Sequence, residues 1–235
     1  ESPITFTGLK NGTSYSFSIV ASNTNGTSDA VITAPMSPQA GWKRFVIDEK
    51  ADAKHVASTT FNGKPLLAYT DSKSGILKIA RWDGKAWKKS TVDGAGGTAG
   101  RTKSAITSTV SLCVNGSGLA QTLHIFYSES DERDLHYATY DGKKFTYEIV
   151  DGNGVQVNDY KDPVRVRTGS DVSVSNACVA TSGGIQVFYR DESQGILLGA
   201  TKVKGSSKWS YELVDGDRKT DGRSTGDVAF HLKAL

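Results

Sequence analysis

The sequence predicts an all-β chain in which four-stranded units repeat along most of its length. Its 235 residues are 37% hydrophobic and include 25 glycines, a composition typical of turn-rich β-structure. Apolar runs at helical spacing are absent from the sequence. A phrase that begins with an aromatic residue and ends with an aspartate six positions later occurs four times. Its copies begin at Trp42, Trp87, Phe145 and Trp209 and end at Asp48, Asp93, Asp151 and Asp215.

The first segment, residues 1–35, alternates apolar and polar residues around Asn11-Gly12 and Asn25-Gly26. Asn-Gly accepts the positive φ of tight turns, so this segment predicts three short antiparallel strands. The Asn-Gly-Thr triplets at these turns and Asn115-Gly-Ser match the N-glycosylation sequon, but turn formation accounts for each. Residues 36–41, in a stretch with two prolines, predict a linker.

The phrase "LKNGTSYSFSIVASNTNGTS" resembles the last strands of a fibronectin type III domain. Leu9 and Tyr15 stand where that family has its tyrosine corner, and "VASNTNGTS" is similar to its final hairpin. The resemblance covers about 35 residues of a sandwich of about 100. It implies that residues 1–35 are the C-terminal strands of such a domain and cannot close a sandwich alone.

From residue 42 onward, three segments align in one register. They read "LLAYTDSKSGILKIARWDGKAW", "HIFYSESDERDLHYATYDGKKF" and "QVFYRDESQGILLGATKVKGSSKW". In each, a tyrosine is followed by a leucine eight positions later and by an alanine three positions after that. Asp83-Gly84 and Asp141-Gly142 predict two-residue hairpin turns. One upstream strand and the aromatic–Asp phrase complete four strands in each unit.

Four-stranded units that repeat without helices predict a β-propeller. Residues 42–235 would form an incomplete propeller with three full blades and partial ones, and the chain would be a fragment of a longer protein. The first phrase, Trp42–Asp48, has no strands of its own unit, so we expect it to close the last blade as its outer strand. "DVAFHLKAL" predicts the first strand of a fourth blade.

The units resemble bacterial extracellular propeller repeats of the pattern Asp-Gly … Ser-Ile/Leu … His-Ile-x-Tyr … Leu-x-x-Ala … Trp. "TLHIFYSESDERDLHYATYDG" carries this resemblance best. It implies a secreted or cell-surface protein of bacterial origin and says nothing about activity.

Cys113 and Cys178 lie in apolar runs at matching places of successive units. This pattern favours two small buried residues over a disulfide, and no ligand spacing indicates a metal. No phosphate-cradling loop indicates a cofactor. The net charge of +3 gives no basis for a nucleic-acid partner, and no apolar run is long enough to span a membrane.

The longer loops of a propeller built this way share one face, which we call the long-loop face. They follow the fourth strand of each unit or join its second and third strands, and loops on rigid scaffolds carry function. No Gly-x-Ser-x-Gly or His-Glu-x-x-His sequence indicates catalysis. The candidate ligand-binding residues are Arg101, Asp131, Arg133, Tyr160, Arg167, Arg190, Asp191 and Arg223.

Three of these arginines recur four residues before a first strand: Arg101, Arg167 and Arg223. They could form a ring of guanidiniums that grips an anionic ligand. Alternatively, each could pair with the aspartate that ends the preceding phrase and so fix its loop. Arg101 and Arg223 both follow that aspartate by eight positions, which favours the pairs.

The leading prediction is a non-catalytic extracellular module that recognises a glycan or a surface protein through the long-loop face. The alternative is a fragment of a secreted polysaccharide hydrolase or lyase, or of a sialidase-like enzyme, whose active site is completed by further blades. A third possibility is a spacer without a ligand.

Overall fold

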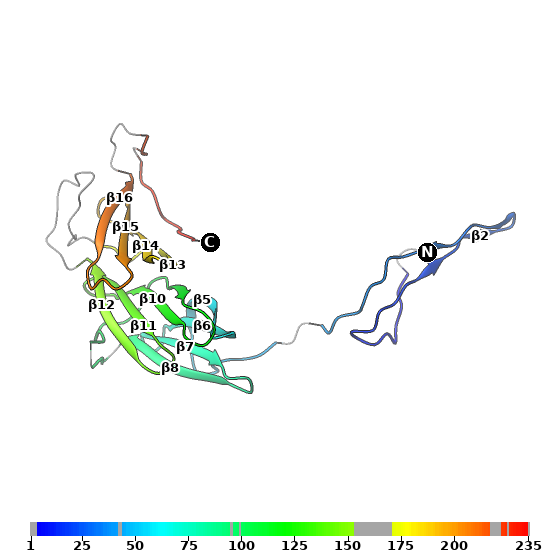
Figure 1. Cartoon of the computed structure of the whole chain (residues 1–235), viewed down its shortest axis with the longest axis horizontal. Coiled ribbons are helices and arrows are strands. Elements are labelled where there is room, and N and C mark those ends of the chain that lie inside the picture. Colours follow the sequence, from blue (N-terminus) through cyan, green and yellow to red (C-terminus); the bar gives the residue numbers. More distant parts are fainter. Residues whose placement is uncertain are drawn as a thin grey trace. The chain divides into compact units, whose positions relative to one another are not determined.

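The computed structural model describes residues 4–41, 44–94, 96–98, 100–152, 171–216, 222–224 and 226–234. Within these residues the chain consists of β-strands, turns and irregular segments (Figure 1). Contacts divide it into two units, Glu1–Val46 and Ile47–Leu235. The described residues include no helix that could cross a membrane.

The N-terminal unit contains two pairs of very short strands. Strand β1 (Ser18–Ile19) pairs with β4 (Val31–Ile32), and β2 (Ser22–Asn23) pairs with β3 (Gly26–Thr27), all antiparallel. The turn before Gly26 is closed by the amide of Asn25, which donates to Asn23 Oδ1 at 2.8 Å. The prediction of three strands is wrong for its first member, since residues 4–10 pair with no strand of the described part.

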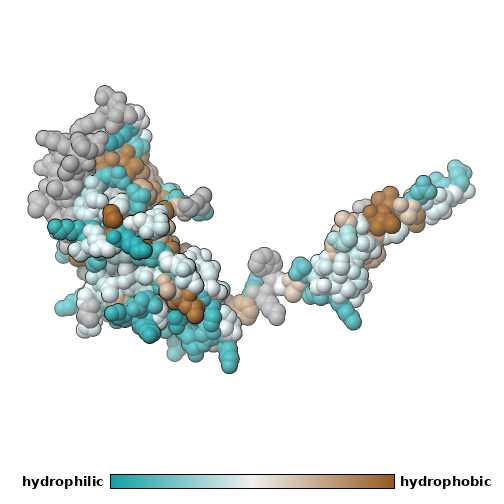
Figure 2. Space-filling model, viewed as in Figure 1, coloured by the Kyte–Doolittle hydropathy of each residue, from teal (hydrophilic) through white to brown (hydrophobic). Residues whose placement is uncertain are grey.

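Apolar side chains of this unit lie on its surface. Ile19, Val31 and Ile32 are 48%, 69% and 69% exposed, and Figure 2 shows apolar surface on the unit. The hydroxyl of Tyr15 accepts a hydrogen bond from the backbone amide of Lys10 at 3.0 Å. Two-stranded pairs with exposed apolar faces bury too little area to be stable alone.

Three four-stranded antiparallel sheets follow in the described part of the second unit (Figure 1). We call them blades 1, 2 and 3. Blade 1 consists of β5 (Ala53–Phe61), β6 (Lys64–Asp71), β7 (Ile76–Trp82) and β8 (Trp87–Gly94). Blade 2 consists of β9 (Ser111–Asn115), β10 (Thr122–Ser128), β11 (Leu135–Tyr140) and β12 (Phe145–Asp151). Blade 3 consists of β13 (Asn176–Thr181), β14 (Gly184–Asp191), β15 (Ile196–Val203) and β16 (Ser210–Asp215).

The strands of each blade pair in sequence order, so the predicted all-β, propeller-like architecture is confirmed. The aromatic–Asp phrase forms the fourth strand of each blade, as expected. A register shift occurs in every blade just before the aspartate: Leu77 pairs with Asp93, whereas Lys78 pairs with Thr91. This bulge places two consecutive residues, Val92 and Asp93, in the interior, which regular alternation would not allow.

The core lies between blades. On β10, Leu123, Ile125 and Tyr127 pack against blade 1, and Phe126 packs with residues of blade 3. Because side chains alternate along a strand, one central strand supplies both interfaces. The hydrophobic repeat is therefore buried by stacking of blades, which explains why one blade cannot be stable alone.

The segment that leads out of each blade is anchored to that blade by a matching backbone hydrogen bond. The amide of Ile106 donates to Gly75 O, that of Val172 to Arg133 O, and that of Val228 to Gly195 O, at 2.9, 3.1 and 3.1 Å. Residues 226–234 thus start as the predicted fourth blade would. They form no strand within the described residues, because a strand needs a neighbour to pair with.

The predicted closing strand is not formed within the described part of the chain. Trp42 and Lys43 lie outside the described residues, and residues 44–48 pair with no described strand. Asp48 nevertheless contacts blade 1, because it accepts a hydrogen bond from Tyr69 OH at 2.9 Å. Asp93 and Asp151 make the same kind of contact with blades 2 and 3.

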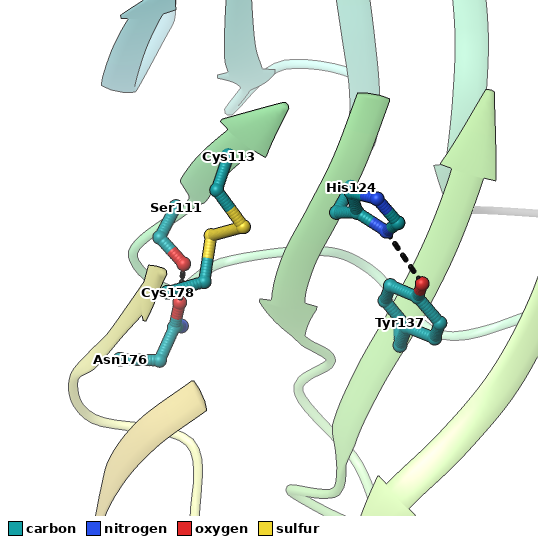
Figure 3. The surroundings of a disulfide bond; sticks show 6 residues. All are labelled: Ser111, Cys113, His124, Tyr137, Asn176 and Cys178. Carbon is teal, nitrogen blue, oxygen red and sulfur yellow. Dashed lines mark hydrogen bonds between the residues drawn. A yellow bond between two sulfur atoms is a disulfide. The ribbon is translucent and has the colours of Figure 1, made fainter. Parts of the chain in front are cut away.

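The cysteine prediction is wrong: Cys113 and Cys178 form a disulfide (Figure 3). It joins β9 of blade 2 to β13 of blade 3, where the two Cα atoms are 5.9 Å apart. The hydroxyl of Ser111 and the side-chain amide of Asn176 hydrogen bond beside it. The matching positions of the two cysteines in successive units suggested two equivalent buried residues. In stacked blades, however, the first strands of successive blades lie side by side, so equivalent residues on them can bond to each other.

Candidate ligand-binding cleft

A tyrosine–aspartate hydrogen bond joins each pair of neighbouring blades. The hydroxyl of Tyr127 donates to Asp93 at 2.6 Å, and that of Tyr189 donates to Asp151 at 2.5 Å. Tyr69 and Asp48 repeat the arrangement at the start of blade 1. Asp93 is fully buried, and burial raises its carboxyl pKa while the tyrosine hydroxyl opposes that shift. We call these contacts interblade clasps.

The same aspartates also close the loop that follows them. Asp93 Oδ1 accepts the amides of Gly94 and Thr102 at 2.7 and 2.8 Å. Asp215 likewise accepts the amides of Gly216 and Ser224. Arg101 and Arg223 both follow their aspartate by eight positions. This spacing is explained by the hydrogen bond from the aspartate to the backbone amide of the next residue, Thr102 or Ser224.

The predicted ion pair of Arg101 with Asp93 is wrong. No ion pair among the described residues joins them, and Asp93 instead accepts hydrogen bonds from a hydroxyl and two amides. Arg101 Nε instead donates to Tyr147 OH at 3.0 Å, and its guanidinium carbon lies 5.9 Å from the centre of that ring. Tyr147 OH donates in turn to Val92 O at 2.9 Å, so blade 1 and blade 2 together orient the arginine.

Arg223 lies within electrostatic reach of Asp215. The amide and hydroxyl of Ser224 lower the pKa of that carboxyl most, and the charge of Arg223 lowers it further. Arg167 and Tyr160, the other two candidates from the long loops, lie outside the described residues.

Arg101 lines a cleft of about 310 Å³ on the long-loop face. Its walls come from the loop after β8, the hairpin between β10 and β11, and β12. Besides Arg101, they present Thr102, Ser104, Glu132, His136 and Tyr147. The prediction that the two kinds of longer loop meet is supported by the hydroxyl of Ser104, which donates to Asp131 at 2.7 Å.

Several acidic residues of the cleft are committed to structure. The carboxylate of Glu129 is buried and accepts the amides of Asp131 and Asp134 at 2.7 and 3.2 Å. Glu148 is held by Lys202 and by Trp209 Nε1. Glu132 is exposed and has no such contact within the described residues, so it faces Arg101's cleft as an available acceptor.

His136 closes the inner part of the cleft. Burial lowers the pKa of its imidazole, against the opposing charges of Asp93 and Glu129. Its ring stacks on Tyr127, one of the clasp tyrosines, with ring centres 5.6 Å apart. A neutral imidazole can both donate and accept a hydrogen bond, which suits a hydroxyl-rich ligand.

Arg133, Arg190 and Asp191 do not line the Arg101 cleft and have structural partners. Arg133 pairs with Asp171 at 2.8 Å. Arg190 is 1% exposed and binds Glu192, Asp227 and the carbonyl of Val228, which ties blade 3 to the segment after it. Asp191 is fully buried and accepts the amide of Gln194. The alternative of a guanidinium ring stays untested, because Arg167 lies outside the described residues.

Sequence reasoning missed Glu132, His136 and Tyr147. A signal existed for Tyr147, since Tyr211 stands at the same place of the next phrase and donates to Val150 O at 2.7 Å, as Tyr147 does to Val92 O. His136 takes the place of Lys78 in blade 1, which lies between Asp71 and Asp48. Within the described residues, no group of three or more His, Cys, Asp or Glu could hold a metal.

The blades and the cleft between them describe a propeller-type chain with a polar cleft. No family model matches the sequence, and no curated protein matches it. A solved structure of the fucose-specific lectin from Aleuria aurantia, in its mercury-derivative form, is similar at 15% sequence identity and a TM-score of 0.45. The alignment covers 90% of this chain and 56% of the lectin, so the chain spans just over half of the length of that protein.

Proposed function

We propose that this chain is a non-catalytic module that binds a glycan in the cleft between blades 1 and 2. The observation that carries the proposal is the orientation of Arg101 by Tyr147 beside the exposed Glu132. A guanidinium and a carboxylate supply charged donors and acceptors for sugar hydroxyls, and hydrogen bonds to charged groups are the stronger ones. Tyr147 supplies an aromatic surface in the same cleft.

The hydrogen bonds of the cleft carboxylates favour a binding role over hydrolysis. Glycosidases use two carboxyl groups at a set separation, one of them with a raised pKa. Burial raises the carboxyl pKa of Asp93, but this residue is fully buried in a clasp and does not line the cleft. Glu129 has both oxygens bound by backbone amides.

We also propose an extracellular or cell-surface location and a fibronectin type III origin for residues 1–35. The disulfide supports the first, because disulfides persist in oxidising compartments. The bond from the Lys10 amide to the Tyr15 hydroxyl supports the second, because a tyrosine corner bonds back to the backbone a few residues upstream.

A glycan array with the whole chain, followed by titration calorimetry on the best ligand, tests the binding proposal. Arg101→Ala should weaken binding by about ten- to a hundredfold, the loss expected for a hydrogen bond to a charged group. Tyr147→Phe should weaken it less, since it removes the hydroxyl that orients Arg101 but keeps the ring.

Arg81→Ala is the matched control. Arg81 lies over Tyr140 with the same 5.9 Å between guanidinium carbon and ring centre, but it does not line the cleft. Its loss should leave glycan affinity unchanged. Equal effects of the two arginine variants, or an array on which no glycan binds, would contradict the proposal.

A further inference from the structure

A second cleft, of about 520 Å³, lies on the other side of the segment that enters blade 2. It is bounded by the start of β5, the hairpin between β6 and β7, and residues 105–107. Thr102 and Ser104 line the Arg101 cleft, and Ala105 and Thr107 line this one. The two clefts therefore share one wall but no lining residue.

The second cleft is basic. Lys54, His55 and Lys73 line it, and no carboxylate side chain does. Ion pairs among the described residues engage neither lysine. The nearest acids are committed elsewhere, since Asp71 pairs with Lys78 at 2.8 Å and Asp52 accepts the hydroxyl of Ser72. Asp52 and Asp71 therefore lie behind the hydroxyl groups of Ser72 and Ser74, and the charged side chains on the lining itself are Lys54 and Lys73.

His55 is held in a strained conformation at this site. Its φ of 47° lies in the left-handed region, which costs a residue with a Cβ about 1 kcal/mol or more. The register of β5 breaks between Lys54 and Ala57, so the histidine occupies a β-bulge. Blade 2 has no such bulge, because its first strand pairs from Ser111 onward after a single bridge at Ile106. Strain and bulges of this kind concentrate at binding sites.

The hydroxyl groups of the cleft distinguish between anionic ligands. Thr70 donates its hydrogen to Lys54 O, Ser72 to Asp52, and Ser74 to Asp71. Thr70 is 2% exposed, whereas Ser72 and Ser74 are accessible, so their oxygens remain as acceptors that need a donor opposite them. Inorganic sulfate and carboxylate offer no donor, whereas a sugar offers its hydroxyl groups.

We propose that this second cleft binds an anionic sugar, in which Lys54 and Lys73 neutralise a sulfate or carboxylate group. His55 donates a hydrogen bond to the same group, and the hydroxyl oxygens of Ser72 and Ser74 accept from the sugar. The inference extends the proposed glycan binding to a charged ligand class but uses none of the residues of the Arg101 cleft.

Titration calorimetry at low salt with sulfated maltotetraose, maltotetraose and sodium sulfate tests this site on the whole chain. Lys54→Gln/Lys73→Gln should weaken binding of the sulfated sugar on the order of tenfold. The matched control is Lys143→Gln/Lys144→Gln, which removes the same charge from an exposed outer turn and should leave affinity within about twofold. Arg101→Ala should also leave it unchanged, which separates this site from the first one.

His55→Asn tests the histidine, because asparagine tolerates the left-handed conformation without an imidazole. It should weaken binding about threefold without lowering the thermal unfolding midpoint. Equal losses in the two double-lysine variants would overturn the proposal in favour of unspecific attraction. Sodium sulfate that binds as tightly as the sulfated sugar would overturn it in favour of an inorganic anion site.

Discussion

Among single residues, His124 has the most unusual environment. It is 5% exposed, shares a 2.6 Å hydrogen bond from Nδ1 with Tyr137 OH (Figure 3), and leaves Nε2 buried without a partner in the described structure. Burial, aided by the charge of Lys202, lowers the pKa of its imidazole from 6.5 to about 4. The histidine is therefore neutral in the folded protein at neutral pH.

This shift predicts acid sensitivity. The unfolded chain takes up a proton near pH 6.5 and the folded chain near pH 4, so the stabilisation is present above pH 6.5 and is lost as the pH falls toward 4. The loss should reach about 3 kcal/mol. Urea unfolding of His124→Gln, the residue that blade 3 has as Gln186, should show a smaller loss across this window. An identical pH profile would contradict the assignment.

The clasp tyrosines offer a second test at the residue scale. Tyr127→Phe removes the hydroxyl from the fully buried Asp93 and should lower the free energy of unfolding by about 1–3 kcal/mol. Tyr69→Phe is the matched comparison, because Asp48 keeps the ammonium group of Lys89 at 3.0 Å. Its cost, measured in the same urea titrations, should be clearly smaller. If both substitutions lowered the free energy of unfolding equally, Lys89 would not be compensating Asp48 for the lost hydroxyl of Tyr69.

The residues of the site were only partly predictable. Arg101 was identified from its repeated place in the loops, and it does line the cleft. Its partner, Tyr147, was not identified. The spacing of eight between Asp93 and Arg101 suggested an ion pair, whereas Asp93 binds the backbone amide of Thr102. His136 and Tyr147 lie on β11 and β12 of blade 2, far in sequence from the Arg101 loop. Their position beside Arg101 depends on how blades 1 and 2 stack.

At the scale of elements, the disulfide joins the first strands of blades 2 and 3 and closes a loop with a sequence separation of 65. Loop-closure entropy predicts that it stabilises the protein by about 4 kcal/mol. The variant Cys113→Ala/Cys178→Ala should therefore unfold at a lower temperature than the unreduced protein. Added reductant should lower the midpoint of the natural chain and leave that of the variant unchanged. A natural chain insensitive to reductant would contradict this.

The strands themselves were predictable because their pattern is local. Alternating residues, Asp-Gly turns and the aromatic–Asp phrase all act within a few residues. The bulge before each aspartate was not predictable, since it arises from the need to bury both Val92 and Asp93. The strands expected at residues 4–10 and 44–48 are not formed, because pairing depends on neighbours that the described residues do not provide.

At the scale of the molecule, the order of the blades follows from one contact that repeats. Each phrase aspartate binds the tyrosine of the next blade, so the clasps set a direction along the chain. The repeated tyrosine and aspartate positions were visible in the sequence. The contact between them was not, because Asp93 and Tyr127 are 34 positions apart and Asp151 and Tyr189 are 38 apart.

The single disulfide makes the two interblade boundaries mechanically unequal. Blades 2 and 3 share a covalent tie near their inner strands, so thermal breathing cannot separate them there. Blades 1 and 2 are held by packing and hydrogen bonds among the described residues. The boundary where Arg101 reaches Tyr147 therefore depends on noncovalent contacts alone among the described residues.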